Sequence, residues 1–151
     1  MSEGPAGSRS EDDQPNVMMT LEKKVRRAAG HFPKKSSATA NIDVFFRQEN
    51  DNTRYAIELK CFHRANQREP NNRYDAYANL ANLEVYLDEH ADAGMFVLLT
   101  NHPHYYDGEF RPHNATTADF SLRHNHEYAA GRVLVYNTAN KYGPDLTLRK
   151  S

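Results

Sequence analysis

Residues 41 to 62, NIDVFFRQENDNTRYAIELKCF, constrain the fold more than any other stretch of this chain. Two apolar-rich runs flank the polar cluster 49–52, and this pattern predicts a β-hairpin with a turn of about four residues. A turn centred on that cluster places Asp43 directly opposite Glu58. Facing residues in an antiparallel pair point to the same side of the sheet, so the two carboxylates are expected to lie close together.

A third charged residue joins this pair through strand alternation. Glu58 and Lys60 share one face, whereas Cys61 points to the other, where we predict a small core residue rather than a nucleophile. Facing carboxylates repel each other, and a divalent cation held by oxygen ligands relieves the repulsion. The hairpin therefore predicts a Mg²⁺ site, with Mn²⁺ able to substitute. The simpler alternative is an exposed cross-strand charge pair, but the apolar character of residues 55–62 favours a site near buried surface.

The same residues carry a family resemblance. Asp43, a gap of 14 residues and the tripeptide Glu58-Leu59-Lys60 resemble the PD-(D/E)xK motif of the restriction-endonuclease-like nuclease superfamily. The resemblance implies a Mg²⁺-dependent endonuclease that hydrolyses phosphodiester bonds in DNA, with RNA as the alternative substrate. Asp43, Glu58 and the backbone carbonyl of Leu59 would bind the metal, and Lys60 would position the attacking water and help to deprotonate it. A glutamate of the first helix often joins this site in the superfamily. Glu22 is the match, with a solvated helix acid as the alternative reading.

The expected order of elements resembles the same superfamily. Apolar residues spaced three or four positions apart predict amphipathic helices over 17–30 and 73–90, and a continuous apolar run predicts a buried strand over 95–100. Two further short strands are expected at 133–136 and 146–148. Together with the hairpin, this order implies an α/β fold with a restriction-endonuclease-like core, α-β-β-β-α-β, in which helices flank a central mixed β-sheet. A non-catalytic nucleic-acid-binding module or subunit that keeps the fold is the alternative to an enzyme.

Composition sets the organisation of the chain. Residues 1–16 are rich in Gly, Ser, Pro and acids and predict a disordered acidic tail, which leaves residues 17–151 as a single nuclease-like domain. The formal net charge is −1, but the tail holds four acids and one base, so the remaining chain is mildly basic. A single cysteine, the lack of a signal-peptide core and the lack of a long apolar run predict a cytoplasmic protein without membrane association.

Basic residues gather before and after the hairpin. The segment 23–35 contains six Lys and Arg and no acid, which favours contact with a phosphate backbone over a merely solvated face. Arg73 and Asp75 on the second helix are weaker site candidates, for which solvated polar residues are the alternative. Because the chain shows no separate target-recognition domain, specificity is expected from loops, a homodimer or a partner protein. The predicted nucleic-acid contacts are Lys23, Arg27, Lys34, Lys35, Arg64, Arg68 and Arg73.

Histidines offer a second chemical signal. A zinc site needs about four ligands, and His-x-His pairs on loops can supply two each. No cysteine accompanies these residues and their spacing follows no known finger pattern, so zinc is only a secondary alternative. The residues concerned are His102, His104, His113, His124 and His126.

Overall fold

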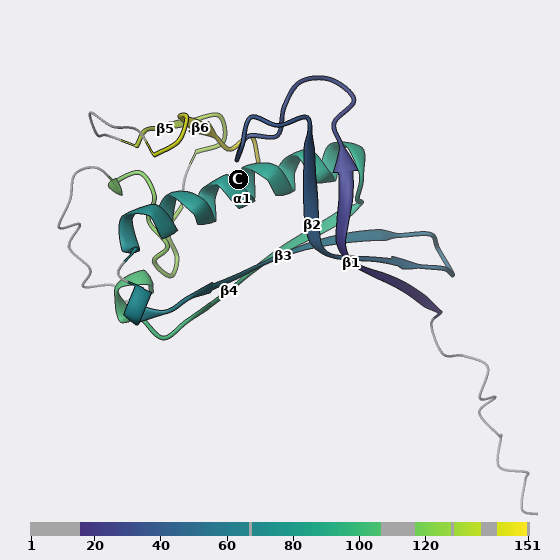
Figure 1. The fold of residues 1–151 in the computed structure, drawn as a ribbon, viewed down its shortest axis with the longest axis horizontal. Helices are drawn as coiled ribbons and strands as arrows, with labels where there is room; N and C mark the ends of the chain where they lie inside the picture. Colours follow the sequence, from purple (N-terminus) through teal and green to yellow (C-terminus); the bar gives the residue numbers. More distant parts are fainter. Residues whose placement is uncertain (1–15, 67, 107–116, 128, 137–141, 151) are drawn as a thin grey trace, which may run out of the picture.

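The computed structural model describes residues 16–66, 68–106, 117–127, 129–136 and 142–150. They form a mixed α/β fold with a four-stranded mixed sheet, a long helix and a short two-stranded ribbon (Figure 1). The main elements in chain order are β1 (Val17–Arg26), β2 (Thr39–Gln48), β3 (Arg54–Phe62), α1 (Glu69–Glu89), β4 (Ala93–Thr100), β5 (Val133–Leu134) and β6 (Leu146–Thr147). Short 3-10 turns, η1 (Arg64–Asn66) and η2 (Pro103–Tyr105), follow β3 and β4.

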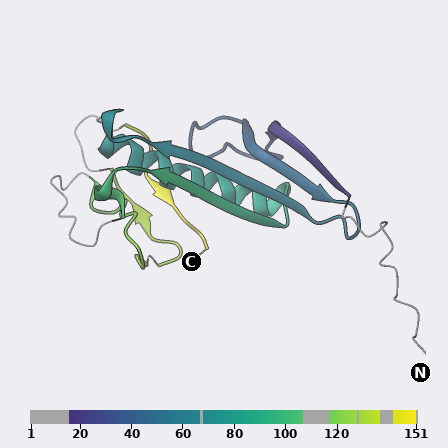
Figure 2. The ribbon, with the colours of Figure 1, turned by 90° about the horizontal axis from the view of Figure 1, so that it is seen from below.

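The sheet has the strand order β1-β2-β3-β4. β1, β2 and β3 are antiparallel neighbours, and α1 forms the crossover that lets β4 join β3 in parallel. α1 lies along one face of the sheet (Figure 2). The β5–β6 ribbon packs against another side of α1, where Tyr77, Leu134 and Leu146 belong to one buried cluster. The described residues therefore stack as sheet, helix and ribbon.

The predicted β-hairpin is confirmed together with its register. β2 and β3 are antiparallel, and Val44 pairs with Ile57, as a turn centred on residues 49–52 requires. Regular pairing between the two strands ends at Val44, so Asp43 lies one residue beyond the last ladder pair.

The helix predicted over residues 17–30 is wrong, because this segment forms β1 and pairs with β2 along its length. Leu21 and Val25 fit a helical spacing, but Val17, Met19 and Leu21 also alternate as in a strand. The segment forms a strand rather than a helix because its backbone pairs with β2. The local spacing of apolar residues does not reveal such long-range pairing. The third antiparallel strand thus precedes the hairpin, and among the described residues a helix covers the sheet on one face only.

β4 is buried on one side only, although the sequence predicted a strand flanked by helices. Phe96 packs towards the core beneath α1. Met95, Val97 and Leu99 alternate onto the opposite face and are exposed. Cys61 reaches this face, as alternation predicted, but it is exposed and is not a core residue. The predictions for β4 and for Cys61 were wrong for the same reason, because the sequence does not show what covers each face of a strand.

α1 begins earlier than predicted, at Glu69, and ends at Glu89. Pro70 suits the first turn, where a backbone N–H has no partner within the helix. Tyr86 packs towards the sheet and Tyr77 towards the ribbon, so α1 is buried on more than one side.

The remaining predictions concern the ends of the chain. The strands predicted at 133–136 and 146–148 are present in shorter form as the antiparallel pair β5 and β6. The predicted N-terminal tail lies outside the described residues apart from Asn16. Within the described part of the chain, no helix combines the length and the apolar character needed to cross a membrane.

Candidate functional site

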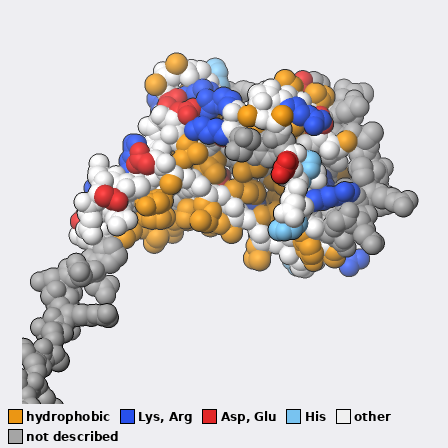
Figure 3. All heavy atoms as spheres, turned by 180° about the vertical axis from the view of Figure 1, so that it is seen from behind, with side chains coloured by type: hydrophobic (Ala, Val, Ile, Leu, Met, Phe, Trp, Pro, Cys, Tyr) orange, Lys and Arg blue, Asp and Glu red, His pale blue; other side chains and the backbone are white. Residues whose placement is uncertain are grey.

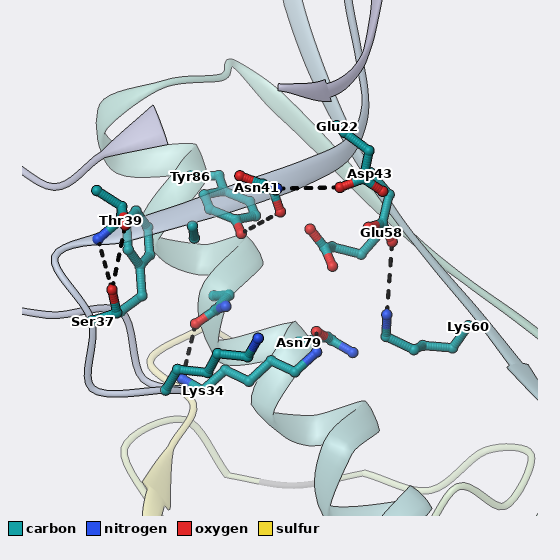
Figure 4. Close-up of a pocket in the computed structure, with 14 residues that line it drawn as sticks. Glu22, Lys34, Ser37, Thr39, Asn41, Asp43, Glu58, Lys60, Asn79 and Tyr86 are labelled. Atoms are coloured by element: carbon teal, nitrogen blue, oxygen red, sulfur yellow. Dashed lines mark hydrogen bonds and ion pairs between the residues drawn. The ribbon is translucent and has the colours of Figure 1, made fainter. Parts of the chain in front are cut away.

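A cleft of about 410 Å³ opens beside α1, between the bent strands β1 and β2, the strand β3 and the loop that joins β1 to β2. Figure 4 shows the acidic side chains and Lys60 on one side of this cleft and Lys34 with Asn79 on the other. The structure brings six of the predicted site residues together in its lining: Glu22, Lys34, Lys35, Asp43, Glu58 and Lys60.

A bend in the β1–β2 pair creates the acidic side of the cleft. Regular pairing passes from Leu21–Val44 to Lys23–Ile42, and Glu22 between them has a φ of 50°, an uncommon backbone conformation for a glutamate. Glu22 therefore lies on a strand rather than on a helix, and its carboxylate accepts a weak 3.4 Å hydrogen bond from the Asn41 side chain.

Asp43 joins the two strands where their pairing ends. Its Oδ2 accepts a hydrogen bond of 2.7 Å from the backbone N–H of Leu59. The same oxygen lies 3.8 Å from the ammonium nitrogen of Lys60, and both side chains are partly exposed to the cleft. Asp43 and Lys60 thus share the face predicted for them.

Glu58 is the most unusual group in the cleft. It is 3% exposed, and among the described residues its Oε1 has no hydrogen-bond partner. Burial, followed by the nearby charge of Asp43, raises the pKa of Glu58 to about 7. A buried carboxylate oxygen without a partner is costly, and the cleft beside Glu58 is where water or a cation can supply one.

The opposite wall is built by α1 and the loop after β1. Lys34 donates a 2.7 Å hydrogen bond from its ammonium group to Oδ1 of Asn79, and its backbone N–H donates a 3.0 Å bond to Oδ1 of Asn82. Burial and the charge of Lys60 lower the pKa of Lys34. In the described part of the chain, the amide nitrogen of Asn79 is buried without a partner. This wall therefore presents a fixed cation and a free hydrogen-bond donor.

Sequence reasoning missed three residues of this wall and its surroundings. Asn79 and Asn82 lie outside the apolar spacing of the helix, yet they are buried, and Tyr86 lines the cleft beside them. The Tyr86 hydroxyl donates a 3.2 Å hydrogen bond to the carbonyl of Asn41. Two asparagines one turn apart inside a helix were the available signal, because asparagine is a poor helix former.

Several predicted phosphate contacts lie away from the cleft. Lys23 places its ammonium group over the ring of Phe45, 3.2 Å from the centroid. Arg27 donates a 2.6 Å hydrogen bond to the carbonyl of His31. Arg64 is exposed in η1, and Arg68 donates a 3.3 Å bond to the Tyr142 hydroxyl. None of these four residues lines the cleft.

Arg73 has a structural position rather than a surface one. It is 1% exposed and donates a short hydrogen bond to the carbonyl of His104 while lying near the ring of Tyr105. Arg73 was predicted to contact phosphate or to be solvated. In the structure, burial keeps its guanidinium away from solvent and from a ligand. Asp75 is half-buried and accepts a 3.2 Å bond from the Tyr142 hydroxyl.

The donor set of the cleft suits a hard cation. Among the described residues no group of three or more His, Cys, Asp or Glu side chains has the geometry of a metal site. Mg²⁺ is commonly held by one or two carboxylates together with waters and substrate phosphates, so Asp43 and the free Oε1 of Glu58 are a fitting pair. The zinc alternative rests on the histidines. The rings of His102 and His104 pack against each other, and His113 lies outside the described residues.

Comparisons with known proteins give no family for this chain. No family model, curated protein or solved structure matches it. The functional argument therefore depends on the chemistry of the cleft.

Proposed function

We propose that the chain is a metal-dependent nuclease that hydrolyses phosphodiester bonds in DNA and has a restriction-endonuclease-like core. The order β-β-β-α-β supports this proposal, with Asp43 on the second strand and Glu58 and Lys60 on the third. The observation that carries it is the buried Oε1 of Glu58, which has no hydrogen-bond partner among the described residues and faces a cleft shared with Asp43 and three lysines.

Asp43, Glu58 and the backbone carbonyl of Leu59 are the residues that would hold Mg²⁺ or Mn²⁺. A bound divalent cation would polarise the scissile phosphate and make its bound water more acidic. Glu22 and Asp43 fall between paired residues of β1 and β2, and the β2–β3 ladder ends at Val44, so the Asp43 carboxylate lies at the cleft instead of inside a closed ladder.

Lys60 would act on the water and on the developing charge. Its ammonium group lies beside Asp43 and is partly exposed to the cleft, where it can donate hydrogen bonds to the attacking water. The same group stabilises negative charge on the phosphate oxygens as the transition state forms.

The opposite wall would hold the nucleic-acid backbone. Lys34 is fixed by Asn79 and Asn82, and the free amide N–H of Asn79 can donate to a phosphate oxygen. Lys35 is exposed beside them and adds charge without a fixed position. These groups recognise phosphate rather than base edges, so binding is expected to depend little on sequence.

A cleavage assay tests the proposal directly. The full chain should cut supercoiled plasmid or single-stranded DNA with Mg²⁺ or Mn²⁺ and should not cut with EDTA, and Ca²⁺ should support binding with little turnover. Asp43→Asn and Glu58→Gln should abolish cutting. Cleavage that persists in both variants would overturn the assignment, and a parallel assay on RNA determines which nucleic acid is hydrolysed.

One observation favours a non-catalytic nucleic-acid-binding module instead. The Asp43 carboxylate already accepts a hydrogen bond from Leu59 and lies near Lys60, so protein groups alone account for it. In that case DNA would bind in a salt-dependent way, with no cutting in either metal.

A further inference from the structure

The face of the sheet that points away from α1, here called the outer face, is apolar and uncovered among the described residues. Leu21, Val44, Ile57 and Met95 are successive neighbours across all four strands, so their side chains form one row on this face. Figure 3 shows hydrophobic side chains gathered along this part of the molecule. Between 40% and 69% of the surface of each of these residues is exposed: Met19, Leu21, Leu59, Met95, Val97 and Leu99.

The chemistry of the outer face selects its partner. Strand alternation adds Phe46, Gln48, Tyr55, Cys61 and Ala93 to this face, and none of these residues or of those already named is charged, so this part of the sheet offers no cation to a phosphate backbone. It can meet a second copy of itself without placing like charges opposite each other. Two sheets with the same twist pack face to face at about −30° and roughly 10 Å apart, with side chains interdigitating.

The outer face is large enough for a weak, concentration-dependent interface. β3 and β4 pair over eight residues, roughly 26 Å, whereas β1 and β2 continue the face only along the five pairs from Val17–Gln48 to Leu21–Val44, roughly 17 Å. With strands about 4.8 Å apart the face covers roughly 400 Å² in plan, so two copies would together bury roughly 800 Å², the size of a weak or transient contact. In a dimer with a two-fold axis through this face, both copies use the same residues for the contact.

We propose that the outer face is the interface between two copies of this chain, packed sheet on sheet around a two-fold axis. The cleft is lined in part by α1 and so lies on the opposite side of the sheet, and the dimer does not depend on the proposed chemistry. The two clefts would point away from each other, and each would act on its own stretch of nucleic acid.

Cys61 provides a reporter that needs no engineering, since it is the single cysteine of the sequence and is exposed on the outer face. The test uses the full chain and measures its mass by sedimentation and the rate at which Ellman's reagent modifies Cys61, both as functions of protein concentration. We expect twice the monomer mass at high concentration and a modification rate that falls as the dimer forms. Dilution should restore both the monomer mass and a fast reaction.

Two substitutions and a matched control complete the experiment. Met95→Glu and Val97→Glu should give monomers in which Cys61 reacts rapidly at every concentration. Val133→Glu, at an exposed valine of β5 on the far side of α1, should leave the dimer intact. The wild-type measurement decides the matter even where a variant fails to fold.

Three results would overturn the proposal. They are a monomer at all concentrations, a dimer in which Cys61 stays fully reactive, and a growing aggregate without a defined mass. The second result would assign the contact to another surface, such as the edge of β4.

Discussion

The carboxylate of Asp43 accepts a 2.7 Å hydrogen bond from the backbone N–H of Leu59. The bond crosses from β2 to β3 one residue beyond the last ladder pair, so a side chain takes the place of a backbone acceptor. Asp43 therefore has a structural task besides its proposed task as a metal ligand. Asparagine keeps an acceptor oxygen and removes the charge, so it separates the two tasks.

The first prediction compares Asp43→Ala with Asp43→Asn in the metal-free protein. Asp43→Ala should lower the free energy of unfolding by about 1 kcal/mol, because the Leu59 N–H loses its acceptor while relief of repulsion from Glu58 offsets part of the loss. Asp43→Asn should cost clearly less. Urea unfolding in EDTA measures both, and Mn²⁺ should stabilise neither variant. If the alanine variant is as stable as the wild type, the hydrogen bond contributes nothing.

Lys60→Ala should reduce DNA cleavage in Mg²⁺ at least about 100-fold, since it removes the group that acts on the water and on the developing charge. Its DNA affinity measured in Ca²⁺ should change little, because Lys60 is not a metal ligand. Lys24→Ala is the matched control, as Lys24 is an exposed lysine of β1 outside the cleft. Equal cleavage by the two variants would remove Lys60 from the mechanism.

Lys34→Ala should weaken DNA binding to a similar extent for all sequences and reduce the slope of log affinity against log salt by about 0.9, the loss of one phosphate contact. Lys35→Ala should have a smaller effect, because no asparagine fixes that side chain in place. Lys150→Ala serves as a control, since Lys150 pairs with Asp88 at 3.4 Å and does not line the cleft. A salt slope that stays unchanged in Lys34→Ala would assign Lys34 a purely structural role.

The acidic half of the site was predictable because it depends on local rules. The turn fixed the register, Val44 with Ile57, that brings Asp43 and Glu58 to one cleft, and strand alternation placed Lys60 beside them. A short stretch of chain contains all the information for these three residues.

The other half depends on parts of the chain that are distant in sequence. Asn79 and Asn82 look like solvated helix residues until the loop carrying Lys34 packs against them. β1 is a strand because β2 offers it backbone partners, a contact that local periodicity does not contain. The same limit explains why the exposure of the outer face was not foreseen.

The last prediction concerns pH and rests on the raised pKa of Glu58. Its carboxyl has a pKa of about 7 in the folded chain, against 4.5 for an unburied glutamate, so the metal-free folded state binds the proton more tightly than the unfolded state does. The stability that this group contributes is fully present below pH 4.5 and is lost as the pH rises to about 7, a decrease of about 3 kcal/mol.

Urea unfolding in EDTA across this pH range measures the effect of Glu58, and Glu58→Gln isolates it from the other titrating groups. The variant should lack this part of the decrease, because glutamine stays neutral at every pH. Mg²⁺ should stabilise the wild type more as the pH rises, since it competes with the proton for the same carboxylate. If wild type and Glu58→Gln lose stability in parallel between pH 4.5 and 7, Glu58 is ionised in the folded protein, and the unpartnered oxygen has a solvent or protein partner.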